Sequence, residues 1–187
     1  MKKFPFLLLL TVICATSLLS CSDDDNNNDI WKAYYEWRDD NNEWMLQQQQ
    51  RTNADGSRYY DVIVPDWNPS AYVLIHYFND RKLTEGNLSP LSTSTVDVRY
   101  KGFLYNNTPF DSSTLMTDYG PGIFRSKLNT LISGWTIAFE TMRVGDTAEI
   151  IIPYEQAYGT TTGTDIPPYS NLRFNVRLVD IYAYEKQ

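Results

Sequence analysis

Cysteine and histidine are almost absent from this 187-residue sequence, which has two cysteines and one histidine. Zinc sites are built mainly from clusters of these two residue types, so the composition argues against a bound metal. Both cysteines, Cys14 and Cys21, lie near the start of the chain. The rest of the chain has no thiol and no disulfide, and we expect its stability to come from packing alone.

The scarcity of histidine also argues against nucleophilic hydrolysis. A hydrolytic triad needs a histidine beside its nucleophile. The only candidate is His76, in the apolar stretch YVLIHYF, where we expect a structural role. Phosphate-binding glycine loops are missing too, because Gly120-Pro-Gly122 is typical of a turn. Paired carboxylates for glycoside hydrolysis are left open, although no cleft argues for them.

Positive charge is in short supply. Sixteen Lys and Arg face 23 Asp and Glu, which gives a formal net charge of −7. Nucleic acid rewards basic surfaces, so we expect no nucleic-acid partner. The same balance opposes electrostatic attraction to anionic lipid headgroups.

Long hydrophobic runs are missing as well. The longest, residues 4–12, is too short to span a bilayer, and it follows Lys2 and Lys3 as in a secretory signal. The segment ends Leu18-Leu-Ser-Cys21, which resembles the lipobox of bacterial lipoproteins and implies that Cys21 carries lipid. We therefore expect a signal peptide over residues 1–20 and an outer-membrane lipoprotein facing the periplasm or the cell surface. Its only membrane attachment would be the acyl chains.

The residues after Cys21 predict a tether and then a helical extension. The run SDDDNNND over residues 22–29 cannot bury anything and should be solvated, and its acidic residues weakly resemble a surface-export signal of Bacteroidota lipoproteins. Apolar residues recur at near-helical spacing over residues 30–50, with Asp29 as N-cap and an interruption at Asn41-Asn42. Residues 53–56 read as a turn and residues 59–64 as a strand.

Strands and one short helix follow, and aromatic residues are abundant: 14 Tyr, 8 Phe and 5 Trp. Alternation predicts strands over residues 96–104 and 172–178. Residues 72–78 and 147–153 also read as strands. Trp135, Ala138, Phe139 and Met142 share one face of a helix that Gly145 ends. The expected fold class is α+β, an antiparallel sheet packed over one short helix.

Six short motifs occur in order along the second half of the chain. They are Val98-Arg-Tyr100-Lys-Gly102, Phe110-Asp-Ser-Ser113, Ile132-Ser-Gly-Trp135, Met142-Arg-Val-Gly145, Ala157-Tyr-Gly159 and Ile166-Pro-Pro168. In this order and spacing the series resembles the FKBP-type peptidyl-prolyl cis–trans isomerases, from about Tyr72 to Tyr182. The resemblance implies an FKBP-like antiparallel sheet wrapped around the helix and an aromatic cleft that binds proline.

The resemblance also implies site residues, carried over by motif position. The catalytic group would be Tyr100, Asp111 and Tyr158. The substrate-binding group would be Phe110, Phe124, Leu131, Ile132, Trp135, Ile166 and Phe174, with the Trp135 indole as the floor. Donors to the substrate would be the Tyr158 hydroxyl and the Ile166 N–H. No basic residue follows the FDSS motif, so we expect Asp111 to rely on Tyr100 and backbone donors.

Two functions remain open at this point. One is a peptidyl-prolyl isomerase that assists exported proteins to fold, with no cofactor and no metal. The other is a catalytically weak chaperone or peptide-binding module with the same pocket. Either would bind proline-containing segments of exported proteins, and the resemblance adds macrolide inhibitors. The predicted division is residues 1–20 signal peptide, 21–29 lipidated tether, 30–71 extension (helix plus strand) and 72–184 isomerase domain.

Overall fold

The computed structural model describes residues 25–162 and 165–185, with the side chains of residues 25–28 left out. Ten helices and strands position the site in this part of the chain. They are α1 (Asp25–Ala33), α2 (Tyr35–Gln50), β1 (Asp61–Ile63), β2 (Val73–Tyr77), β3 (Thr95–Leu104), β4 (Pro109–Ser112), β5 (Phe124–Lys127), α3 (Ser133–Phe139), β6 (Thr147–Ile152) and β7 (Leu172–Ala183). The predicted signal peptide and Cys21 lie outside the described residues.

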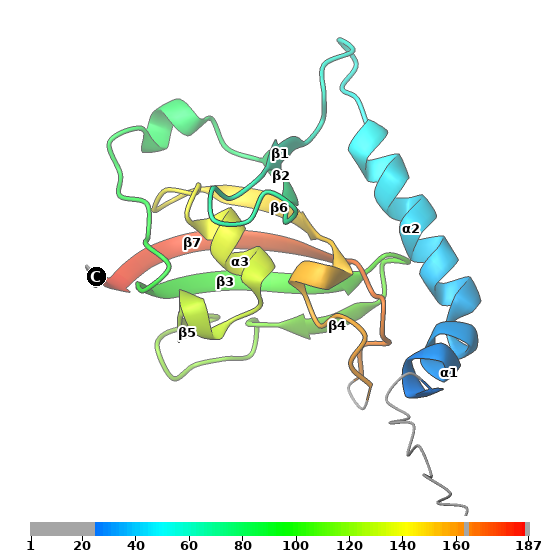
Figure 1. Cartoon of the computed structure of the whole chain (residues 1–187). Helices are drawn as coiled ribbons and strands as arrows, with labels where there is room; N and C mark the ends of the chain where they lie inside the picture. Colours follow the sequence, from blue (N-terminus) through cyan, green and yellow to red (C-terminus); the bar gives the residue numbers. More distant parts are fainter. Residues whose placement is uncertain (1–24, 163–164, 186–187) are drawn as a thin grey trace, which may run out of the picture.

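All seven strands belong to one antiparallel sheet, in the order β1-β2-β6-β7-β3-β4 with β5 also paired to β3. The sheet curves around α3 (Figure 1). Alternation along the strands explains which face meets the helix. In β3, Val96, Val98 and Tyr100 are buried in the core cluster with α3, whereas Arg99 and Lys101 are exposed. The predicted α+β class, a sheet wrapped on one short helix, is confirmed.

The central helix is shorter than its sequence pattern. It ends at Phe139, yet Met142 is still fully buried, because the residues after the helix continue to pack against the core. Gly145 then takes a φ of +96°, which other residues rarely adopt, and turns the chain into β6. Gly134 lets α3 approach the sheet, since an added Cβ would collide with Ile152.

The N-terminal helices differ from expectation at their start. Asp29 lies inside α1, which begins at Asp25, so the prediction of Asp29 as an N-cap was wrong and the helix enters the segment expected to be tether. The chain turns at Tyr34 between α1 and α2. Asn41 does not interrupt α2. Its side chain donates to the Trp37 carbonyl (2.8 Å) and is fully buried against the rest of the protein.

Helix α2 contacts the sheet on the face opposite α3. Met45 packs in a second cluster with Tyr60, Leu74 and Ile151. Leu74 and Ile151 alternate along their strands with residues that face α3, so this cluster lies on the outer face. Figure 1 shows α2 running beside one end of the sheet, away from β5. The predicted extension is thus part of the folded unit, and its strand β1 completes the sheet beside β2.

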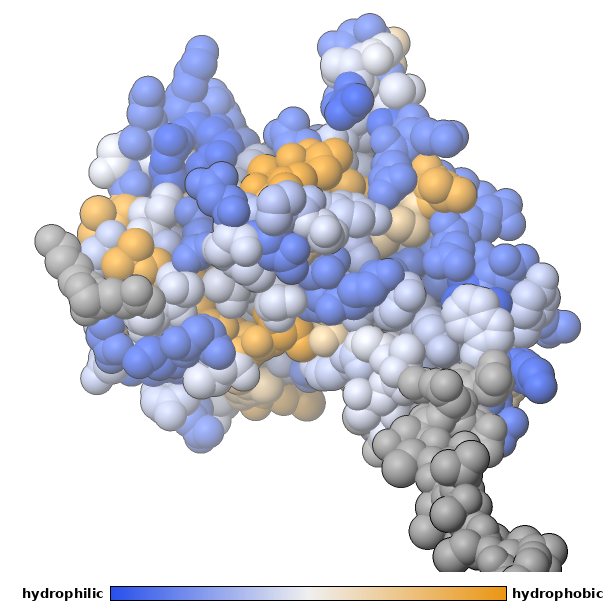
Figure 2. Space-filling model, viewed as in Figure 1, coloured by the Kyte–Doolittle hydropathy of each residue, from blue (hydrophilic) through white to orange (hydrophobic). Residues whose placement is uncertain are grey.

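The face of the molecule drawn in Figure 2 is mainly hydrophilic. Figure 2 shows apolar residues gathered in separate patches between polar ones on the face seen in Figure 1. Within the described ranges, no helix combines the length and apolar character needed to cross a membrane. His76 has the structural role expected of it. Its ring stacks on Tyr59 at 3.9 Å, and its Nδ1 lies 2.7 Å from the Tyr59 carbonyl oxygen.

Candidate active site

A cavity of about 220 Å³ opens at the end of α3, between β3, β4, β5 and β7. Nine of the ten predicted site residues line it, together with Thr130, which was not predicted. The predicted ones are Tyr100, Phe110, Asp111, Phe124, Leu131, Ile132, Trp135, Tyr158 and Phe174. The tenth, Ile166, is buried in the same hydrophobic cluster as Trp135 but does not line the cavity. The fold therefore brings together nine predicted residues that are far apart in the sequence. The catalytic and binding roles assigned to them remain predictions.

Trp135 is the centre of an aromatic shell. Its indole lies edge-to-face with Tyr100 (5.1 Å between ring centroids, 83°) and Phe174 (5.3 Å, 89°). Phe124 meets it in the same way at 6.1 Å. Such perpendicular contacts are the favoured geometry of aromatic pairs and hold the rings rigidly. Trp135 is 4% exposed, and its Nε1 has no hydrogen-bond partner within the described residues. The floor is therefore apolar and buried, apart from one indole N–H that donates to none of the described residues.

Tyr100 and Asp111 form the polar wall. The Tyr100 hydroxyl donates to the Asp111 carboxylate at 2.6 Å, as expected, whereas no described backbone N–H does so. Burial raises the pKa of Tyr100 well above its usual range, and the hydrogen bond and charge of Asp111 raise it further. The backbone is fixed as well, because Tyr100 N donates to Ser113 Oγ at 3.0 Å. The hydroxyl stays protonated and keeps the carboxylate in place beside the cavity.

Tyr158 lies at the rim and is not part of that hydrogen-bonded pair. It is 43% exposed, and its hydroxyl makes no hydrogen bond to the part of the chain that the structure describes. Partial burial, and then the negative charge of Asp111, raise the pKa of Tyr158. A protonated hydroxyl with no internal partner is available to donate to a bound ligand.

Gly102 shapes the site, although the motif that contains it assigns it no role. A Cβ built there would lie 2.7 Å from Phe110 Cζ and 2.9 Å from Phe174 Cε1. Both rings line the cavity and contact each other at 5.5 Å. The bare backbone at Gly102 thus lets two phenylalanines lie over β3. The available signal was a glycine within an alternating strand, which often marks a close approach.

No group of three or more His, Cys, Asp or Glu residues in the described ranges could hold a metal ion. What the site offers is an apolar floor, a carboxylate held by a tyrosine and one available hydroxyl. Such a cavity can bind an apolar group and hold it by one hydrogen bond while a neighbouring bond rotates, without any bond being broken.

The curved sheet, the single enclosed helix and the indole-floored cavity define an FKBP-like fold. Residues 86–179 match the sequence model of the family described as FKBP-type peptidyl-prolyl cis-trans isomerase, and the chain belongs to that family.

Curated relatives agree over the same region. The chain is 43% identical over 97 residues to a "Macrophage infectivity potentiator" of Trypanosoma cruzi, covering 51% of this chain and 47% of the relative. It is 42% identical over 93 residues to the "FKBP-type 22 kDa peptidyl-prolyl cis-trans isomerase" of Escherichia coli, covering 49% and 43%. The chain therefore spans less than half the length of these relatives.

Solved structures show the same fold. An isomerase structure from Pseudomonas syringae superposes with a TM-score of 0.61 at 24% identity, covering 81% of this chain and 95% of that one. FkpA from Escherichia coli gives 0.64 at 23% identity, covering 85% of this chain and 65% of that one. These matches extend well beyond residues 86–179, so the fold likeness is not limited to the family region.

Proposed function

We propose that this protein is a peptidyl-prolyl cis–trans isomerase. The observation that carries the proposal is the cavity itself, floored by Trp135, walled by aromatic rings and bordered by the available Tyr158 hydroxyl. Family membership supports it.

The reaction requires rotation only. Resonance in the C–N bond creates a barrier of ~18–20 kcal/mol, and an X–Pro bond left alone rotates in roughly tens to hundreds of seconds. In the twisted transition state the resonance is lost, so the carbonyl oxygen carries less negative charge than in the planar amide. A dry aromatic cavity disfavours the polar planar form more than the twisted one. Lowering the barrier by ~5–7 kcal/mol would accelerate the rotation about 10⁴–10⁵-fold.

The chain's own groups have distinct parts in this scheme. The aromatic shell around Trp135 receives the prolyl ring and excludes water. The Tyr158 hydroxyl donates to a substrate carbonyl and fixes the peptide on one side of the rotating bond. The Asp111 carboxylate, held by Tyr100 at 2.6 Å, shapes the wall where the preceding carbonyl turns. No proton is transferred, so the reaction does not depend on a group that titrates near neutral pH.

Two-dimensional exchange NMR on an Ala-Leu-Pro-Phe test peptide checks the proposal. The full chain should accelerate cis–trans exchange, and Trp135→Leu should abolish the acceleration. Trp67→Leu is the matched control, because Trp67 is 59% exposed and does not line the cavity. Peptide binding without faster exchange would instead identify a catalytically weak chaperone or binding module. A macrolide that blocks exchange would show that inhibitor and peptide share the cavity.

The cellular setting is part of the same proposal. A signal peptide over residues 1–20 and lipid on Cys21 would place the protein at the outer membrane, facing the periplasm or the cell surface, where exported proteins with proline-containing segments fold. Residues 21–29 would tether it, residues 30–71 would be an extension and residues 72–184 the isomerase domain. Metabolic labelling with a radioactive fatty acid should mark the wild type and not Cys21→Ser. Protease treatment of intact cells would distinguish the two faces.

A further inference from the structure

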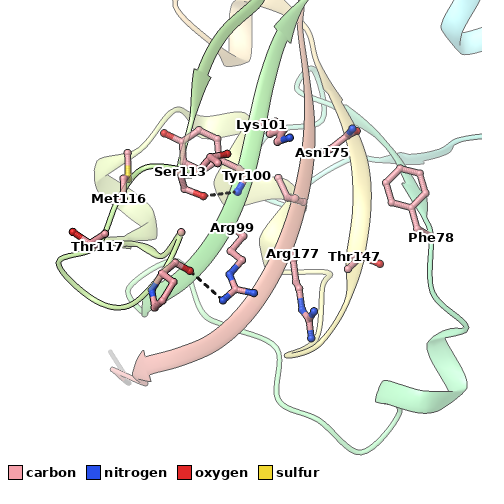
Figure 3. A pocket seen from close by; sticks show the side chains of 14 residues that line it. Phe78, Arg99, Tyr100, Lys101, Ser113, Met116, Thr117, Thr147, Asn175 and Arg177 are labelled. Atoms are coloured by element: carbon pink, nitrogen blue, oxygen red, sulfur yellow. Dashed lines mark hydrogen bonds between the residues drawn. The ribbon is translucent and has the colours of Figure 1, made fainter.

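A second hollow, of about 580 Å³, lies on the outer face of the sheet, where none of the helices in the described part of the chain covers β3 and β7 (Figure 3). Its floor is the backbone of β3 and β7, since the Val176 side chain belongs to the core cluster on the α3 side, and its sides are the loop through Met116 on one flank and Phe78 on the other. Val176 is buried, whereas Phe78 is 53% exposed. The volume falls within the usual range of ligand-binding pockets. Because Arg99 and Lys101 alternate with inward-facing Tyr100, this hollow opens on the side of the sheet away from the proline cavity.

The charged residues in its lining are Arg99, Lys101 and Arg177, and all three are cations. None of them forms an ion pair with any residue that the structure describes. Arg99 donates only to the Pro121 carbonyl, at 3.1 Å. Three unpaired cations in one hollow stand out in a chain whose net charge is −7.

The strand register makes this arrangement unfavourable for the fold itself. Arg99 of β3 and Arg177 of β7 are direct cross-strand partners, and Figure 3 shows both side chains on this face of neighbouring strands. Like charges directly opposite each other in an antiparallel pair are destabilising. The nearby carboxylate of Glu149 is already held by Arg173 at 3.1 Å and by the Tyr60 hydroxyl. The opposed arginines therefore destabilise the fold by themselves, whereas a bound anion would neutralise both of them.

We propose that this outer hollow, lined by Arg99, Lys101 and Arg177, is a docking site for an acidic polypeptide segment of another protein. Carboxylates would neutralise the two arginines, and apolar side chains would cover Phe78 and Met116. The apolar side chains of Phe78 and Met116 beside the cations favour a polypeptide over a phosphate or lipid headgroup, because a polypeptide can present carboxylates and apolar groups together. A segment docked here leaves the proline cavity open on the other face.

Fluorescence anisotropy with a labelled eight-residue peptide of glutamate and leucine, without proline, tests the proposal. The full chain should bind this peptide, and should bind a lysine–leucine peptide of equal length at least tenfold more weakly. The double variant Arg99→Gln/Arg177→Gln should bind the acidic peptide at least tenfold more weakly than the wild type. Its melting temperature should stay equal or rise, because the like-charge opposition is removed.

The matched control is Lys32→Gln/Lys82→Gln, which changes the net charge equally at two exposed lysines outside the hollow. It should bind the acidic peptide within twofold of wild type. Equal loss in both double variants would overturn the proposal, because net charge alone would then explain binding. So would displacement of the acidic peptide by the Ala-Leu-Pro-Phe peptide, which would place both in the proline cavity. Binding to phosphatidylglycerol vesicles but not to the peptide would also overturn it.

Discussion

Asn41 of α2 and Asn171, the residue before β7, hold each other through two buried hydrogen bonds. The Asn171 backbone N donates to Asn41 Oδ1 at 2.8 Å, and Asn171 Nδ2 donates to the Asn41 carbonyl at 2.7 Å. Asn171 Oδ1 in turn accepts from the Tyr154 backbone N at 2.9 Å. The N-terminal helix is thereby joined to both ends of residues 154–171, the segment that carries Tyr158.

A second contact reinforces this junction. Trp37 Nε1 donates to Ser170 Oγ at 3.0 Å, and that hydroxyl donates to the Pro167 carbonyl at 2.6 Å. Trp31 meets Tyr169 edge-to-face at 5.9 Å, with the Arg38 guanidinium 3.0 Å from the centre of the indole. Helices α1 and α2 thus order the end of the segment that leads away from the site.

Asn41→Ala should lower the free energy of unfolding by about 1–3 kcal/mol, because it leaves the buried Asn171 N–H without a partner. Urea denaturation measures this. Amide hydrogen exchange should also rise within residues 154–171 and stay unchanged in β3. Asn42→Ala is the control, since Asn42 is the exposed neighbour of the same type. Equal destabilisation by both variants would show that the junction is not responsible, because alanine by itself favours a helix more than asparagine does.

Gly102→Ala should destabilise the protein by about 1–3 kcal/mol through overpacking, because the new methyl group meets Phe110 and Phe174. Both rings must shift, so affinity for the proline test peptide should fall as well. Thermal unfolding and peptide titration check the two effects. Gly86→Ala is the matched control, because nothing lies within 4 Å of its Cβ position. Wild-type affinity in Gly102→Ala would mean that the two phenylalanines do not shape the binding cavity.

Asp111→Leu should slow the isomerisation while leaving the stability of the fold nearly unchanged. Asp111 is exposed and its bond is to one hydroxyl, so the unfolding free energy should change by less than about 1 kcal/mol. Loss of the carboxylate from the wall should slow exchange of the test peptide about tenfold, equivalent to ~1.4 kcal/mol in the barrier. Asp118→Leu serves as a control on an exposed carboxylate elsewhere. An unchanged rate in Asp111→Leu would remove Asp111 from the catalytic group.

Stability should fall in strongly alkaline solution. The pKa values of Tyr60 and Tyr100 are raised from 10.0 in the folded protein, mainly by burial and then by hydrogen bonds to Glu149 and Asp111. Below pH about 10 both folded and unfolded chains keep these protons, and stability does not change through this linkage. Above it the unfolded chain releases them first, so it binds fewer protons and the unfolding free energy falls with pH.

Urea midpoints measured at pH 8, 10 and 11 test this slope. The double variant Tyr60→Phe/Tyr100→Phe should lose less stability between pH 10 and 11 than the wild type, although it starts from a lower value. The variant lacks the two hydrogen bonds to Glu149 and Asp111, which accounts for that lower start. Parallel slopes in the two proteins would show that these tyrosines titrate as in the unfolded chain.

The strands could be predicted where one face is buried. Val96, Val98 and Tyr100 alternate with polar residues because one face of the sheet is exposed to solvent. This two-residue period can be recognised in the sequence. Strands β4 and β5 are four residues each, too short for a period to show, and were not predicted. By its local sequence Asn41 predicts an interruption of the helix, because a polar residue in a helix usually faces solvent. Its partner lies 130 residues away, and no local pattern could reveal it.

The sequence alone determined the α+β class, the strand faces, the acidic balance and the ordered motif series, because periodicity and composition are local properties. Tertiary structure decided which of those residues meet. It brought Tyr158 to the rim, left Ile166 outside the cavity lining, placed Arg99 opposite Arg177 and joined Asn41 to Asn171. Each of these depends on strand register or on packing between distant segments, which cooperative burial of the whole core fixes.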